Sequence, residues 1–201
     1  MRLPVVLYRP KLLKLKGQVL IDSEKVYTGM IRLGDYTVSF YPNTGIVWEN
    51  HGGTVVFKGN CRIGNASAVS VGKKGNLFFG SGFQATSALK IACYHKINFG
   101  DNVLIGWDNI FMDTNFHKIK KLDGEEFGRP YAEIKIGDRC WFGLKCTVMK
   151  GAEVPDNTII SGNTILNKTY NIPAYSVLAG IPANLKLSGV YRDLHDDNIE
   201  Y

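Results

Sequence analysis

A six-residue repeat of apolar residues is the feature that most limits what this chain can fold into. Eight successive positions, six residues apart, carry an aliphatic side chain or Phe: Ile136, Phe142, Val148, Val154, Ile160, Leu166, Ile172 and Leu178. The same period recurs upstream in shorter blocks that begin at Phe57, Val71 and Phe99. A helix would repeat its apolar residues every three or four positions, and the Gly, Asn and Pro residues within the repeat would break it. The repeat therefore predicts short strands separated by bends.

The spacing also predicts how these strands are arranged. Each hexad supplies one large apolar residue that points inward, a small residue at the bend and polar residues that face solvent. Three hexads then make a triangular coil of about 18 residues, and the coils stack at the strand spacing of about 4.8 Å. We therefore expect an all-β fold, a parallel β-helix over residues 46–183. Residues 1–45 are expected to form short strands (at 5–8, 18–21 and 36–40) that cap the first coil, and residues 184–201 a tail with a short helix over 190–195.

Composition excludes several classes of protein. The 201 residues carry a formal net charge of +6, which favours anionic partners. The basic clusters are not interleaved with aromatic residues, so we expect no nucleic-acid partner. No stretch approaches the roughly 18 apolar residues of a membrane-spanning helix, which predicts no membrane insertion. The four cysteines form no C-x-x-C pair and the basic N-terminus lacks a cleavage site, so we expect buried, reduced thiols in a cytoplasmic protein.

One long segment, 114–133, interrupts the repeat and contains a histidine. It is polar, carries Gly and Pro residues and is expected to leave the prism as a loop. His117 lies at its start, close to Asp113 and Asn115. A general base needs one ring nitrogen open to substrate and a partner on the other, and Asp113 or a backbone carbonyl could be that partner. Trp107, just before the loop, could stack on the apolar face of a sugar ring.

These features resemble a known family. The hexads, the loop histidine and the run VLAGIPANLK (177–186) are similar to the left-handed β-helix acyltransferases, also called hexapeptide-repeat transferases. The stretches GDNVLIGWDNIFMDTNFHKI (100–119) and WENHGGTVVFKGNCRIGNAS (48–67) look most similar to the branch of capsule and lipopolysaccharide O-acetylation, which is related to the maltose and galactoside acetyltransferases.

The resemblance implies an activity and a site. Such enzymes transfer acetyl from acetyl-CoA directly to a sugar hydroxyl, without a metal, at a groove between two subunits of a homotrimer. The catalytic base would be His117, helped by Asp113, with Asn115 bonding the acceptor. The positions that match the motifs lining coenzyme A are Trp141, Gly143, Ser161, Gly162, Lys168, Ala179 and Gly180. Two positions depart from the family: Asn115 stands where an acid is usual, and Asn184 stands where a Lys is usual, so we expect one phosphate contact fewer at Asn184.

Three other functions are compatible with parts of the sequence. N-acylation of an amino sugar would need the same residues. A metal-dependent hydratase on this fold would need three His ligands, and no second His lies near His117 in the sequence. A non-catalytic trimeric scaffold would not need His117 or the LAGIP run. The identity of the acceptor does not follow from the sequence.

Overall fold

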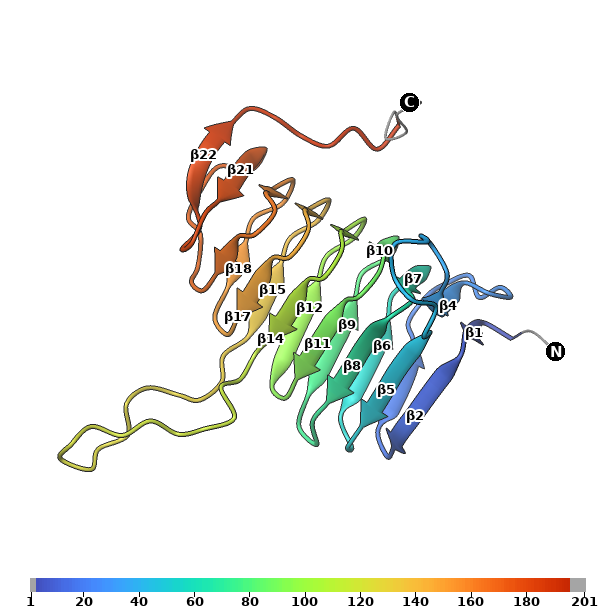
Figure 1. The fold of residues 1–201 in the computed structure, drawn as a ribbon, viewed down its shortest axis with the longest axis horizontal. Helices are drawn as coiled ribbons and strands as arrows, with labels where there is room; N and C mark the ends of the chain where they lie inside the picture. The colour runs from blue at the N-terminus through green and yellow to red at the C-terminus, as the bar shows by residue number, and fades with distance from the viewer. Residues whose placement is uncertain (1–2, 196–201) are drawn as a thin grey trace.

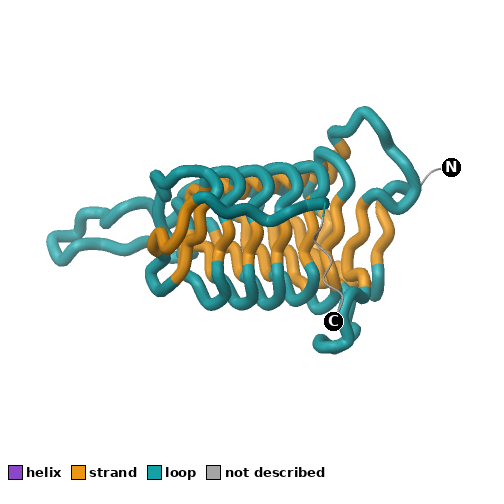
Figure 2. Tube along the Cα trace, turned by 90° about the horizontal axis from the view of Figure 1, so that it is seen from above, coloured by secondary structure: helices purple, strands orange, loops and turns teal. Residues whose placement is uncertain are grey.

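The chain folds into a three-sided prism of stacked coils, described for residues 3–195 by a computed structural model (Figure 1). These residues form 22 strands and no helix, so none of them makes a helix long and apolar enough to cross a membrane. Every paired strand runs parallel to its neighbours except β22, which returns antiparallel to β21. Figure 2 shows the stack from a second direction, with loops at the corners and strands on the faces.

Three sheets, here named A, B and C, form the three faces. Sheet A contains β1 (Val5–Leu7), β4 (Ile31–Asp35), β7 (Cys61–Gly64), β10 (Phe83–Ala85), β13 (Leu104–Ile105), β16 (Trp141–Phe142), β19 (Ile159–Ile160), β21 (Ser176–Ala179) and β22 (Asn184–Ser188). Sheet B contains β2 (Pro10–Leu15), β5 (Ile46–Asn50), β8 (Ser67–Val71), β11 (Lys90–Cys93), β14 (Ile110–Met112), β17 (Thr147–Met149) and β20 (Ile165–Leu166). Sheet C contains β3 (Gln18–Ile21), β6 (Thr54–Phe57), β9 (Asn76–Phe79), β12 (Lys96–Phe99), β15 (Ile134–Ile136) and β18 (Glu153–Val154).

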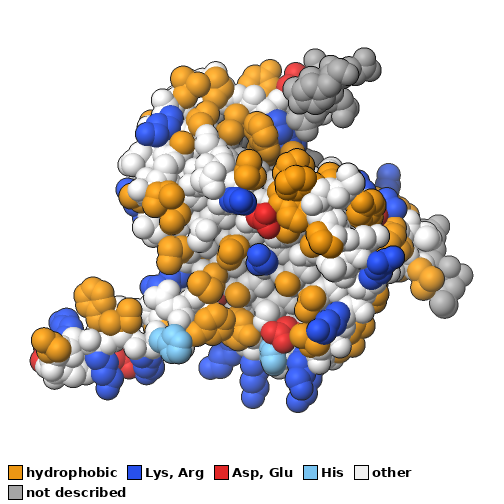
Figure 3. All heavy atoms as spheres, viewed as in Figure 1, with side chains coloured by type: hydrophobic (Ala, Val, Ile, Leu, Met, Phe, Trp, Pro, Cys, Tyr) orange, Lys and Arg blue, Asp and Glu red, His pale blue; other side chains and the backbone are white. Residues whose placement is uncertain are grey.

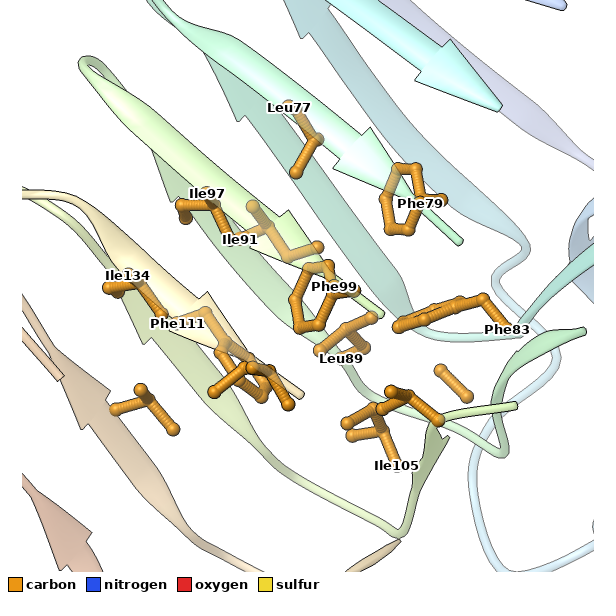
Figure 4. Close-up of a cluster of buried hydrophobic side chains, with 14 of the residues drawn as sticks. Leu77, Phe79, Phe83, Leu89, Ile91, Ile97, Phe99, Ile105, Phe111 and Ile134 are labelled. Carbon is orange, nitrogen blue, oxygen red and sulfur yellow. The ribbon is translucent and has the colours of Figure 1, made fainter. Parts of the chain in front are cut away.

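The apolar residue of each hexad fills the interior. Phe57, Phe79 and Phe99 stack along the axis with ring centroids 5.1 and 5.6 Å apart, and Phe83 and Phe111 meet Phe99 edge-on or tilted at 4.9 Å. Figure 4 shows four of these rings, Phe79, Phe83, Phe99 and Phe111, among buried aliphatic side chains. Each such aromatic pair adds about 0.5–1.5 kcal/mol beyond the burial of its surface. The period seen in the sequence is thus the period of the core.

Corners need residues that tolerate a positive φ or leave room for the next coil. Asn102, Asn157 and Asn163 take φ of 56°, a conformation in which Asn is favoured. A Cβ on Gly143 would lie 2.7 Å from the backbone nitrogen of Gly162 in the next coil. The small and amide residues that follow each inward residue are therefore required by the close stacking of corners.

The two ends of the chain differ from expectation. The predicted strands at 5–8 and 18–21 correspond to β1 and β3, but with β2 they form the first coil itself. The alternating segment 36–40 is no strand; it belongs to a loop, 36–45, between β4 and β5.

The predicted C-terminal helix over 190–195 is wrong. The backbone amides of Gly189 and Val190 both bond to the carbonyl of Tyr175, which closes the β21–β22 hairpin and directs the following residues along the prism. Tyr191 then contacts the ring of Tyr175 at 6.2 Å, in an extended segment that does not satisfy helical hydrogen bonds. Residues 196–201 of the predicted tail lie outside the described residues.

Between β14 and β15 the chain leaves the prism as a long arm, residues 114–133 (Figures 1 and 2). Figure 3, in the view of Figure 1, shows hydrophobic, basic and acidic side chains mixed along this arm. Two isolated antiparallel bridges, Thr114 with Tyr131 and Lys120 with Glu126, hold its two halves together. The expectation of an ejected loop agrees with this arm.

Candidate active site

Two corners of the prism contain the residues predicted for the site. The A–B edge is the row of corners where the chain passes from sheet A to sheet B, and the B–C edge is the row where it passes from sheet B to sheet C. The arm leaves from the B–C edge of the coil formed by β13, β14 and β15. Trp107 lies at the A–B edge of that same coil.

His117 is exposed near the root of the arm, and its ring has no hydrogen-bond partner among residues 3–195. The backbone amide of Asn115 donates to the carbonyl of Pro130 at 2.7 Å, and that of Phe116 donates to the hydroxyl of Thr114 at 3.0 Å. These bonds fix the backbone just before His117. One ring nitrogen is thus open to a substrate hydroxyl, and the partner that a general base needs on the other nitrogen is not supplied by residues 3–195.

Asp113 has a different role from the one expected. Its side chain is fully buried, and its two carboxylate oxygens accept hydrogen bonds from the backbone amides of Tyr94 and His95, each at 2.8 Å. It makes no hydrogen bond to His117. The expectation that Asp113 orients the catalytic ring is therefore not met: the carboxylate is used to hold the corner of the preceding coil.

The same corner supports the arm through aromatic contacts. Tyr94 meets Phe116 edge-on at 4.7 Å, and His95 packs against Tyr131 at 4.7 Å. One contact therefore holds the outgoing half of the arm and the other holds the returning half. Tyr94 and Tyr131 were not singled out from the sequence, because the contact joins segments that are distant in the chain.

The outer surface of sheet B, next to the arm, is an apolar groove of about 310 Å³. The side chains that line it are mainly small or apolar, and they include Val47, Ala68, Ala92, Ile110 and Met112. A series of side-chain hydrogen bonds lies on the side of this groove nearest the B–C edge. The hydroxyl of Ser70 donates to Glu49 at 2.5 Å and lies 3.1 Å from the hydroxyl of Tyr94. The corresponding surface of sheet C is charged instead, with Lys58, Lys96, Glu133, Lys135 and Glu153 lining one hollow.

Most residues predicted to line coenzyme A lie along the A–B edge. Gly143, Ser161 and Gly162 occupy its corners in two successive coils. Gly180 lies at the same edge in the following coil, where its amide donates to the hydroxyl of Thr164 at 3.3 Å. Ala179 precedes it in β21, and Trp141 points outward from β16 with 39% of its surface exposed. Gly180 has φ of +108°, which few other residues adopt.

The structure does not bring all the predicted residues together within one chain. Lys168 lies on the B–C edge, with its ammonium 5.7 Å from the ring centre of Tyr170. Asn115 and His117 are on that edge too, whereas Trp107, Gly143, Ser161 and Gly180 are on the other side of sheet B. A single copy of the prism therefore presents two half-sites.

Sequence reasoning missed two aromatic residues at the A–B edge. The loop 36–45 places Phe40 and Tyr41 against Trp107, with ring centroids 5.6 and 6.3 Å from it. The sequence feature that marks this loop is that residues 36–45 do not follow the six-residue repeat. Within residues 3–195 there is no group of three or more His, Cys, Asp or Glu able to hold a metal.

Comparison with known proteins finds O-acetyltransferases among the relatives of this chain. No family model matches the chain. It is 30% identical over 129 residues to the galactoside O-acetyltransferase of Escherichia coli K12, a match that covers 63% of this chain and 58% of that protein. It is 23% identical over 158 residues to WbbJ of the same organism, a protein named as a lipopolysaccharide biosynthesis O-acetyl transferase, covering 73% and 80%.

The fold is shared with a solved structure, the polysialic-acid-specific acetyltransferase NeuO. It superposes with a TM-score of 0.54 over 97% of this chain and 91% of that chain, at 14% sequence identity. The expected fold, a left-handed parallel β-helix, is confirmed, and so is the resemblance to the hexapeptide-repeat acyltransferases. The chain spans less than two thirds of the length of the galactoside enzyme.

Proposed function

We propose that this chain, whose sequence and fold are those of the hexapeptide-repeat acyltransferases, is an acetyl-CoA-dependent O-acetyltransferase acting on a sugar or a polysaccharide precursor. The observation that carries the proposal is the division of the predicted residues into two half-sites on either side of sheet B, with an unpartnered imidazole on one and a row of small residues on the other. The names of the two E. coli relatives, which refer to galactosides and lipopolysaccharide, support a saccharide as the acceptor.

In the proposed reaction His117 acts as the general base. It takes the proton of the acceptor hydroxyl as the oxygen attacks the thioester carbonyl of acetyl-CoA. The new C–O bond forms, the C–S bond breaks, and the proton passes from His117 to the departing sulfur, so that free CoA leaves. Because the acetyl group moves directly, no side chain needs to form an acyl intermediate.

The donor would lie along the A–B edge. Gly143, Gly162 and Gly180 present no side chain there, so an extended pantetheine arm could approach the backbone and Trp141 could pack against it. Lys168 would reach the phosphates of coenzyme A from the facing B–C edge, where its ammonium is exposed. No metal takes part in this scheme.

The two half-sites would meet in a homotrimer. If sheet B of each copy faces a threefold axis, the A–B edge of one copy lies next to the B–C edge of the following copy. The apolar outer surface of sheet B suits such a contact better than the charged surface of sheet C. His117 of one copy would then face the donor edge of its neighbour, at the level of the coil that contains Trp107.

N-acylation of an amino sugar would use the same base and donor edge, and no residue of the site discriminates against it. A scaffold without catalysis would not need the exposed imidazole of His117 beside the prism. The four buried, free cysteines fit a reducing compartment, and we place the enzyme in the cytoplasm on that basis.

The test is a thiol-release assay with acetyl-CoA and a panel of nucleotide sugars, free sugars and oligosaccharides. Burial raises the pKa of all four cysteine thiols, that of Cys140 to about 12, so the folded protein should give little background with a thiol reagent. Acceptor-dependent release of CoA, with a product heavier by one acetyl group and labile to mild base, supports the proposal. An alkali-stable amide product would assign N-acylation instead, and no acceptor-dependent release from a trimer that binds acetyl-CoA would contradict both.

A further inference from the structure

Building on the proposed acetyltransferase function, we propose that Phe40, Trp107 and Asp108 form a carbohydrate-binding subsite on the A–B edge that holds a sugar ring of the acceptor. The subsite consists of a stacked aromatic surface with a carboxylate beside it. It belongs to this chain's own loop 36–45, which departs from the hexad repeat.

The aromatic surface is open to solvent. Phe40 lies on Trp107 with ring centroids 5.6 Å apart and an interplanar angle of 23°, and 74% of Phe40 remains exposed. Tyr41 supports the pair edge-on, at 5.3 Å from Phe40 and 6.3 Å from Trp107. An apolar ring exposed to this extent costs free energy unless something covers it, and the apolar face of a sugar ring is a good match for a flat aromatic surface.

The surface is held in place by partly buried hydrogen bonds. The loop 36–45 climbs the corner beside β7 and β10 in Figure 1. Thr37 donates to the carbonyl of Thr86, and Asn65 donates to the carbonyl of Pro42 at 2.9 Å. On the opposite side the buried amide of Asn109 donates to the carbonyl of Trp107 at 3.2 Å. With the bond from Tyr41 to Asp108, the loop is anchored to the corners of three successive coils.

The carboxylate is poised to accept hydrogen bonds from hydroxyls. The phenol of Tyr41 donates to Oδ2 of Asp108 at 2.5 Å, while no donor among residues 3–195 reaches Oδ1. Burial, together with the hydrogen bond to Asp108, raises the pKa of Tyr41 to about 12, so the phenol keeps its proton at neutral pH. One oxygen of Asp108 is thus fixed and the other is free to accept from a sugar hydroxyl.

The same geometry argues against the phosphates of coenzyme A as the ligand. A carboxylate next to the ring would repel phosphate groups. Trp107 lies one coil before Gly143, with its carbonyl accepting from the backbone amide of Lys145 at 2.7 Å, and Gly162 and Gly180 continue the edge away from it. In the proposed trimer it would face the partner's arm at the level of the reacting histidine.

The experiment compares the whole trimeric protein with three variants on a glycan array and by isothermal titration with acetyl-CoA. Phe40→Ala removes the exposed ring, Phe40→Leu keeps apolar volume without a flat face, and Tyr27→Ala removes an exposed ring at the N-terminal end of sheet A as a matched control. We expect the unaltered protein to bind a set of array glycans, both Phe40 variants to bind them about 3- to 10-fold more weakly, and Tyr27→Ala to match the unaltered protein. Affinity for acetyl-CoA should be unchanged in all of them.

Three other results would overturn the subsite, and a fourth would overturn the proposed function alone. Failure of the unaltered protein to bind any array glycan, or equal glycan binding by Phe40→Ala, overturns the subsite. Loss of the trimer on sedimentation of Phe40→Ala would make the ring a subunit contact and also overturn it. If glycans bind through Phe40 but acetyl-CoA does not bind at all, the proposed acetyltransferase function fails while the subsite stands.

Discussion

Replacing His117 by Ala and replacing Asp113 by Asn should separate catalysis from folding. His117 is exposed and bonded to nothing among residues 3–195, so its truncation leaves neither a cavity nor an unpaired buried group. We expect thermal stability within experimental error of the unaltered protein and unchanged affinity for acetyl-CoA. Loss of a general base lowers turnover by about 10²–10⁴-fold, or roughly 2.7–5.4 kcal/mol in the activation barrier.

Asp113→Asn should behave in the opposite way. Its buried oxygens accept two backbone hydrogen bonds of 2.8 Å, and an amide can replace only one of these acceptors while its NH₂ group faces a donor. A hydrogen bond to a charged group contributes about 1.5–3 kcal/mol, so the melting temperature should fall by roughly 3–12 °C. Activity at a temperature where the variant is folded should be lowered far less than by His117→Ala.

The assay is thiol release under saturating acetyl-CoA, with melting followed by circular dichroism. His51→Ala is a matched control, because His51 is a second exposed histidine of the B–C edge whose nearest charged group is Glu49 at 3.4 Å. Near-normal turnover by His117→Ala, with loss of turnover in a correctly folded His95→Ala trimer, would refute the assignment of the base. An Asp113→Asn protein as stable as the unaltered one would refute the role given to that carboxylate.

Two further predictions concern the core and the aromatic surface. Phe99→Ala should destabilise the prism by about 3–5 kcal/mol in denaturant unfolding, because Phe99 is fully buried against three other Phe rings. The control Phe78→Ala, on the outer face of sheet C, should lower the free energy of unfolding much less. Equal losses in the two variants would mean that the stacked Phe column is not the source of stability. The folded-state pKa of Tyr41 is raised to about 12 from an ordinary value of about 10, so the stability that its phenol contributes should be complete below pH 10 and lost as pH rises toward 12. Stability curves of the unaltered protein and Tyr41→Phe should therefore converge over that interval, and a constant difference up to pH 12 would contradict the bond to Asp108.

The hexad predicted the core because each repeat has one residue that must point inward. The same period also determines which residues line up along the A–B edge. Positions 143 and 161 are 18 residues apart, as are positions 162 and 180, and 18 residues make one full coil. Residues separated by one coil share a corner. The alignment of Gly143 with Ser161, and of Gly162 with Gly180, could therefore have been predicted from the coil length alone.

The parts that could not be predicted depend on contacts between coils. Asp113 is four residues from His117, a spacing that suggested a pair, but the backbone turns outward after Asp113 and leaves its carboxylate inside against Tyr94 and His95. Residues 36–40 alternate like a strand, yet the loop bonds to corners of later coils through Thr37 and Tyr41. Neither the contacts of Asp113 nor the path of the loop 36–45 can be predicted from the residues next to them in the sequence.

The central claim, a site completed by two copies of the chain, is tested most directly by mixing two inactive variants. His117→Ala damages the B–C half-site, and Ser161→Trp fills the A–B half-site with a bulky ring. Each trimer alone should be inactive. After the two are unfolded together in equal amounts and refolded, random assembly of a cyclic trimer should give about one quarter of its sites both an intact His117 and an intact donor edge. Recovery of about one quarter of the unaltered activity is the predicted result; no recovery from well-folded mixed trimers would show that each site lies within one chain.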